Sequence, residues 1–265
     1  MRVGTFARDN RELEDAVREN ADFVDIRLGI DRSGLVLADA KKTLAEHGIS
    51  SSLHTPSEQN WRGADISRMV LPYVDLGREM DAEFVTMHTT LSSLFYTDEE
   101  IHAFLDNVPL VYDAAREVGV VLSVESFGFN HAELALLFNA CPEMRLTLDI
   151  GHEQLVASRN RAIDLIQVFH DRIVQVNVHD NRGQDALNEV LETRKRRTVS
   201  VEEVREIARK YDLHLPIGEG TIRFNELFSA LRCTGYDGRF LMLCSDRSRF
   251  NDERRKFVRL WSEAC

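Results

Sequence analysis

Two kinds of stretch alternate along this chain: short apolar runs, and longer segments in which apolar residues recur at helical spacing. The short runs are rich in β-branched residues, which is typical of strands. Eight of them predict strands, over residues 2–6, 23–28, 49–54, 84–89, 120–126, 145–150, 173–180 and 240–245. Amphipathic helices are expected between them, most clearly over residues 10–20, 34–48, 98–119 and 160–172. Eight parallel strands joined by crossover helices can close into a barrel that has no free sheet edge.

One interval, residues 183–213, is too long for a simple connection. Its pattern predicts two inserted helices joined near residues 198–200, where Ser200 and Glu203 form a capping-box pattern. We interpret this interval as an elaborated loop over one mouth of the barrel. No internal repeat or low-complexity linker divides the chain. The predicted architecture is therefore a single (β/α)8 TIM barrel domain over residues 1–265, with a helical insertion after the seventh strand.

Residues of one parity in the predicted strands are almost all apolar, and those of the other parity are mostly polar. The apolar set, which includes Val85, Met87, Leu241 and Leu243, is expected to face the helices. The polar set is expected to point into the barrel, and on five strands it ends in a residue able to bind a metal. These pairs are Ser52 and His54, Thr86 and His88, Ser123 and Glu125, Thr147 and Asp149, and Asn177 and His179.

These five strand ends are expected to meet at one cavity, because active sites of parallel barrels lie at the carboxyl ends of the strands. A divalent cation would relieve repulsion between the carboxylates, and neutral imidazoles would supply nitrogen ligands. A single histidine is more often a hydrogen-bonded residue than a ligand, so the convergence carries this prediction. Asp212 and His214 would point the same way on an extended backbone. Other histidines are expected at the surface: His47, His102, His131 and His170.

Composition and charge narrow the possible cellular locations and binding partners of the protein. The chain is 43% hydrophobic and 29% charged, as expected for a globular protein that buries a sizeable core. A net charge of -11 disfavours long-range attraction to nucleic acid or anionic membranes. No signal peptide or membrane-spanning run is evident, which predicts a cytoplasmic protein without a membrane partner. The four cysteines lack paired spacing and are expected to be reduced thiols.

Several motifs resemble one family throughout nearly the whole chain. "LHTP" at residue 53, "MHTT" at 87, "VES" at 124, "LDIGH" at 148, "VHDN" at 178 and "HLPIGEGTIRF" at 214 are similar to the xylose isomerase-like TIM barrels. That superfamily includes sugar-phosphate isomerases and epimerases and endonuclease IV. The resemblance implies a divalent metal, Zn, Mn, Fe or Mg, held by Glu, Asp, His and a final Glu on successive strands.

The resemblance carries this ligand set onto Glu125, Asp149 and His179, with His214 as a further ligand. The eighth strand departs from the pattern, because "LMLCS" places Cys244 or a neighbour where the final Glu is expected. A thiolate there would favour zinc or iron; otherwise Cys244 is a small buried residue. His54, His88, His152 and Asn181 are implied substrate contacts.

Three functions follow from the resemblance. In the first, a metal-dependent isomerase or epimerase acts on a sugar or sugar phosphate, and Glu125 removes the proton beside a polarised carbonyl. Glu219 of "GEG" is a candidate second carboxylate, or it fixes a tight turn. Trp61 is expected to stack on a sugar, to cover the mouth or to pack on a helix.

In the second, an endonuclease IV-like zinc phosphodiesterase acts on abasic DNA, with nucleic acid the less favoured partner. The implied multinuclear set is His54, His88, Glu125, Asp149, His152, His179, Asp212 and His214. The basic run 194–197 would grip phosphate, unless it is a solvated helix end. In the third, the barrel binds a metal or ligand without turnover.

Overall fold

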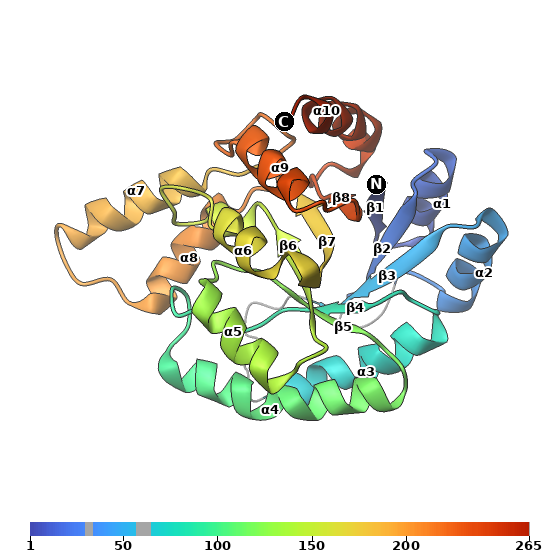
Figure 1. Cartoon of the computed structure of the whole chain (residues 1–265), viewed down its shortest axis with the longest axis horizontal. Coiled ribbons are helices and arrows are strands. Elements are labelled where there is room, and N and C mark those ends of the chain that lie inside the picture. The colour runs from blue at the N-terminus through green and yellow to red at the C-terminus, as the bar shows by residue number, and fades with distance from the viewer. Residues whose placement is uncertain (30–33, 57–64, 265) are drawn as a thin grey trace.

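The computed structural model describes residues 1–29, 34–56 and 65–264, so Trp61 lies outside the described residues. Within that part of the chain, eight parallel strands form a closed barrel in sequence order, as predicted (Figure 1). They are β1 (Arg2–Ala7), β2 (Phe23–Arg27), β3 (Ser50–His54), β4 (Val85–Met87), β5 (Leu122–Glu125), β6 (Arg145–Asp149), β7 (Ile173–Val178) and β8 (Arg239–Met242). Gly4 of β1 lies beside Leu241 of β8, which closes the sheet.

The helices cover the outside of the barrel. They are α1 (Asn10–Arg18), α2 (Leu37–His47), α3 (Ile66–Glu79), α4 (Asp98–Glu117), α5 (His131–Ala140), α6 (Ala162–Phe169), α7 (Gly183–Arg194), α8 (Val201–Tyr211), α9 (Phe224–Cys233) and α10 (Phe250–Glu263). Local chemistry sets several of their ends: Thr97 and Asn130 form capping boxes, and Gly48 ends α2 in the left-handed region at φ 63°. No helix among the described residues is both long enough and apolar enough to cross a membrane.

The predicted insertion forms α7 and α8, with the Ser200–Glu203 capping box at the start of α8. Figure 1 shows this helical pair extending to one side of the barrel. A separate apolar cluster packs it against the loops after β4 and β6; its members are Phe95, Leu155, Val156, Ala186, Val190, Val204 and Ala208. The insertion therefore has a small core of its own beside one mouth.

The interior of the barrel is polar through most of its length. Thr147 makes hydroxyl hydrogen bonds of 2.8 Å with Ser123 and 3.1 Å with Thr86, which places these residues on the inward parity as predicted. The prediction for β8 is wrong. Leu241 and Leu243 face inward and pack with Phe6 and Phe23, while the alternate residues of β8 contact the helices. Both parities of β8 are apolar there, so alternation could not reveal its inward face.

Candidate metal centre

Ligand-type side chains gather at the carboxyl ends of the strands. His54, Glu125 and Asp149 end β3, β5 and β6, while His88 and His179 directly follow β4 and β7. Among the described residues, three groups bring their ligand-type atoms within 4.8 Å of one another. They are His152, His179, Asp212 and His214; His54, His88 and Glu125; and Glu125, Asp149 and His152.

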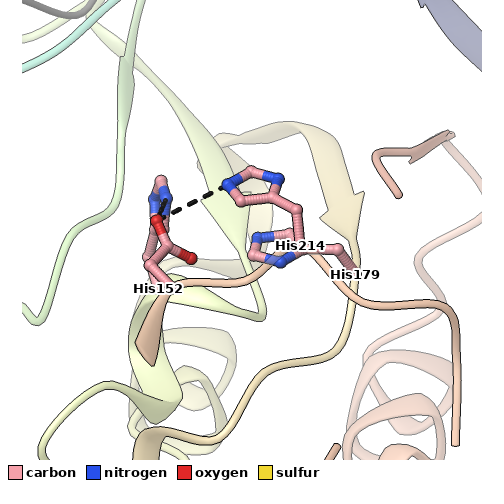
Figure 2. A group of neighbouring side chains, drawn as sticks. His152, His179 and His214 are labelled. Atoms are coloured by element: carbon pink, nitrogen blue, oxygen red, sulfur yellow. Dashed lines mark ion pairs between the residues drawn. The ribbon is translucent and has the colours of Figure 1, made fainter. Parts of the chain in front are cut away.

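The first of these, which we call the His3Asp group, surrounds one carboxylate with imidazoles. Asp212 Oδ2 lies 3.3 Å from His152 Nε2 and 3.5 Å from His214 Nε2, as the dashed lines in Figure 2 mark. The rings of His179 and His214 stack at 3.8 Å with 2° between their planes. Three imidazoles and a carboxylate converging from separate segments match the donors that zinc and related divalent ions prefer.

Two chain segments supply three of the four side chains of the His3Asp group, and the fourth, His179, follows β7. A short 3-10 helix, His152–Gln154, follows β6, and the His152 amide donates to Asp149 Oδ1 at 2.8 Å. Asp212 directly follows the last residue of α8, and His214, two residues later, has a backbone φ of 46°. Its Nδ1 lies 3.0 Å from the carbonyl oxygen of Leu243. The insertion thus returns the chain to the mouth and delivers two of the four side chains.

Glu125 is the buried carboxylate at the centre of the second group. Its Oε2 lies 3.2 Å from both His54 Nε2 and His88 Nδ1, and its Oε1 accepts from Asn177 Nδ2 at 2.5 Å. Asn177 also donates to Asp149 Oδ2 at 3.2 Å. This amide therefore holds the two carboxylates side by side, although the sequence interpretation gave it no role beyond its inward parity.

These contacts shift the pKa values of the site residues. Burial works against the ionised form of Glu125, but His54 and His88 outweigh it and lower the pKa of Glu125 well below its ordinary value. Burial also lowers the pKa of His88, to about 3, against the opposing effect of Glu125. The second group therefore combines an ionised carboxylate with a neutral imidazole.

The pKa of His152 shifts in the opposite direction to that of His88. Burial works against its protonation, but Asp149 and Asp212 outweigh that cost and raise the pKa of His152 well above its usual value. Asp212 in turn has its pKa lowered well below the ordinary value: burial opposes this shift, and His214 and His152 cause it. A proton on His152 therefore offsets the negative charges of Asp149 and Asp212. A bound divalent cation would take over this role.

Orphaned polar atoms test whether these residues fit a metal. His179 Nδ1, His88 Nε2 and Asp212 Oδ1 are buried and have no hydrogen-bond partner among the described residues. Buried polar atoms are rarely left unpaired, and each such atom calls for an explanation such as an ion or a water. With the nitrogen and oxygen donors described above, the residues fit a divalent metal.

Three predicted site residues do not join these groups. Glu219 pairs with Arg249 at 2.8 Å, and its side chain is 47% exposed. Asn181 is buried, with its amide donating to the Gly151 carbonyl and accepting from the Gly183 amide. Cys244 is buried outside the three groups, and Leu243 is the inward residue beside the end of β7.

The basic run of the insertion is engaged locally. Lys195 lies 2.5 Å from Glu192 and Arg197 lies 2.7 Å from Glu203, and all of these side chains are exposed. Both pairs lie within the insertion, so the structure agrees with a solvated helix end for this run.

The chain belongs to the family of xylose isomerase-like TIM barrels, whose sequence model matches residues 13–260. An uncharacterised protein of Methanocaldococcus jannaschii, MJ1614, is 24% identical over 245 residues, which cover 86% of this chain and 84% of that protein. A solved D-tagatose 3-epimerase-like protein has a TM-score of 0.69 at 18% identity, covering 99% of both chains. A solved IolI protein with a binding zinc atom has a TM-score of 0.71 at 16% identity, covering 100% of this chain and 99% of that one. Both structures share the fold.

Proposed function

We propose that this protein is a divalent-metal-dependent isomerase that acts on a sugar-like α-hydroxy carbonyl compound. One observation carries the proposal: the ionised carboxylate of Glu125 lies beside the His3Asp group without belonging to it. The His3Asp group can hold the metal with its own four side chains. Glu125 then remains free to accept a proton from a substrate in the mouth.

The residues of the mouth have separate tasks in this reaction. A bound divalent cation supplies Lewis-acid polarisation of the substrate's carbonyl group. Glu125 removes the proton from the hydroxyl-bearing carbon next to this carbonyl group and returns it to the carbonyl carbon. His54, His88 and Asn177 hold the carboxylate of Glu125 in place through contacts of 2.5 to 3.2 Å. Because these partners fix its direction, little reorganisation is needed at the moment of transfer.

A single base favours isomerisation over epimerisation. Epimerisation at one carbon needs proton exchange on both faces, and the inward position at the end of β8 is Leu243 instead of a carboxylate. Glu219 is occupied by Arg249. Transfer of the carbon-bound proton between neighbouring carbons on one face needs only Glu125, and the hydroxyl proton passes from one substrate oxygen to the other to complete the isomerisation. The epimerase-like and zinc-binding proteins of the same fold support metal-dependent sugar chemistry as the general class.

Solvent-deuterium exchange tests this proposal directly. We expect the metal-loaded protein to incorporate deuterium into at least one member of a panel of ketoses and ketose phosphates. Glu125→Gln should keep its bound metal in the His3Asp group but lose exchange by about a hundredfold or more, because the amide cannot accept the proton. Glu219→Gln, which changes a carboxylate outside the site, should exchange at the wild-type rate. Wild-type exchange in Glu125→Gln, or none in the wild type with any metal, would rule the mechanism out.

A second candidate function is supported by the group of His54, His88 and Glu125. It could hold a second ion beside the His3Asp group, with Glu125, Asp149 and His152 between the two. Clustered metal ions are suited to phosphodiester hydrolysis. Counting metal ions per chain and incubating the protein with an abasic-site duplex test this alternative. Two or more ions together with nicking would favour the phosphodiesterase, whereas one ion and an intact duplex would exclude it.

The remaining alternative is a barrel that binds a ligand or metal without turnover. It predicts no exchange and no nicking under any of these conditions, whether or not a metal is bound. If the purified protein carries no stoichiometric metal, and Asp149→Ala changes neither metal content nor thermal stability, the isomerase and the phosphodiesterase fail together, and so does metal binding without turnover.

A further inference from the structure

Arg27 is the cationic side chain that reaches toward the centre of the mouth from the last residue of β2. It lies beside His54 in the strand register and therefore faces the same side of the sheet. Its Nε donates to Asp25 Oδ2 at 3.0 Å, and Asp25 in turn accepts from the Ser52 hydroxyl at 2.6 Å. Asp25 is fully buried, so these bonds fix the base of the guanidinium group.

The other end of this guanidinium group is unsatisfied. Arg27 Nη2 is buried and has no hydrogen-bond partner among the described residues. The nearest carboxylate oxygen with which it forms an ion pair is Glu125 Oε1, at 4.0 Å. That distance is too long for a hydrogen bond. Arg27 Nη2 is therefore a permanently protonated donor that is held within the site but does not reach the carboxylate of Glu125.

The position of Nη2 suits a reacting α-hydroxy carbonyl group. Because Nη2 lies 4.0 Å from Glu125 Oε1, a substrate carbonyl oxygen that accepts a hydrogen bond from Nη2 brings the neighbouring carbon toward the carboxylate. Proton removal would then occur beside a cationic donor. We propose that Arg27 is a catalytic residue that donates a hydrogen bond from Nη2 to the oxygen that becomes negative during this step. This inference rests on the proposed isomerase function.

The charge movement explains why an arginine suits this position. As the carbon–hydrogen bond breaks, the proton goes to Glu125 and the electron pair forms a carbon–carbon double bond. The carbonyl π electrons move onto the oxygen, which becomes an oxyanion. Glu125 loses its negative charge as the substrate oxygen gains one, so the net charge beside Arg27 is constant. A fixed donor aimed at the new charge stabilises the transition state more than the substrate.

Binding of two small probes to the metal-loaded protein tests the role without knowledge of the natural substrate. Glycolohydroxamate, once it has lost its hydroxamic proton, is an anionic, planar mimic of the deprotonated intermediate, and glycolamide is a neutral mimic of the substrate. We expect Arg27→Gln to weaken glycolohydroxamate binding by about tenfold or more, because a charge-assisted hydrogen bond is lost. Glycolamide binding should change by less than about threefold. Arg27→Lys keeps the charge and should give an intermediate loss, and it replaces the glutamine variant if that variant does not fold.

The matched control is Arg145→Gln, at the exposed start of β6 and thus at the other end of the barrel. It should leave both affinities unchanged. Equal glycolohydroxamate affinity in wild type and Arg27→Gln overturns the inference. Equal weakening of both probes, with loss of metal, also overturns it, because Arg27 would then only support the site. Absence of deuterium exchange in the metal-loaded wild type counts against the isomerase function, whereas exchange that survives Arg27→Gln counts against Arg27 alone.

Discussion

Gly151, the glycine of "LDIGH", lies against the ring of His179. A Cβ atom at this position would lie 2.0 Å from His179 Cε1 and 2.3 Å from Nε2, which no real contact allows. His179 Nε2 also contacts Asp149 Oδ1 at 2.8 Å, so the ring cannot move without disturbing the carboxylate. The glycine therefore permits the close approach of two metal-site segments.

We expect Gly151→Ala to displace His179 and to weaken metal binding. Overpacking of this kind costs about 1–3 kcal/mol in the free energy of unfolding. Metal titration and urea unfolding measure the two effects. Gly48→Asn is the control, because a Cβ at Gly48 meets nothing within 4 Å and asparagine tolerates the left-handed helix end. An alanine variant with unchanged metal affinity would contradict the placement of His179.

At the scale of elements, Arg205 connects α8 to the first turn of α4 and to the segment before it. Its Nη1 donates to the Phe95 carbonyl at 3.1 Å and lies 3.4 Å from Glu100 Oε1, and the guanidinium group lies 4.7 Å from the Tyr96 ring. The chain leaves α8 directly into Asp212. The attachment of the insertion therefore determines where part of the His3Asp group lies.

We expect Arg205→Ala to lower metal affinity about fivefold, because a loosened α8 holds Asp212 and His214 less firmly, at a cost of about 1 kcal/mol. The insertion should also become more sensitive to limited proteolysis. Arg197→Ala removes an exposed ion pair within the same insertion and should change neither property. If both variants bind metal equally well, the insertion does not position the site.

For the whole molecule, the amino-terminal end of the barrel is closed by a buried arginine. The guanidinium group of Arg239 lies 3.8 Å from the ring of Phe23 and 4.9 Å from that of Phe84, and it pairs with Glu83. Arg2 of β1 contacts the same carboxylate at 2.8 Å. Glu83 therefore links β1 and β8 to the segment before β4.

This linkage predicts a pH dependence of stability. Burial works against the carboxylate of Glu83, but Arg2 and Arg239 outweigh it and lower its pKa from 4.5 to about 2. A lowered folded-state pKa contributes stability above about pH 4.5, and this contribution is lost as the pH falls toward 2. The stability gap between wild type and Glu83→Gln should therefore be widest at pH 6 and narrow below pH 4.5. Urea unfolding at several pH values measures it.

Glu117→Gln, at the exposed end of α4, is the matched carboxylate control and should follow the wild-type curve. A gap between wild type and Glu83→Gln that stays constant from pH 6 to pH 3 would show that the ion pairs of Glu83 do not stabilise the fold.

Much of the fold follows from local patterns in the chain. Period-two alternation identified the inward residues of β4 to β7, and the capping box at Ser200 identified the second inserted helix. Alternation failed on β8, where neighbouring residues are apolar on both faces, so the inward position of Leu243 was missed. A pattern can indicate a face only where the two faces differ in polarity.

The sequence by itself determined that an eight-stranded barrel would place imidazoles and carboxylates at one mouth, because strand period and the direction of parallel strands are local properties. Only the tertiary structure decided how these residues divide. It grouped His152 and His179 with Asp212 and His214, left Glu125 outside that group, and held Arg27 at 4.0 Å from Glu125. The grouping depends on where the chain runs after α8, and the distance between Arg27 and Glu125 depends on the width of the barrel. Neither is a property of a single segment of the sequence.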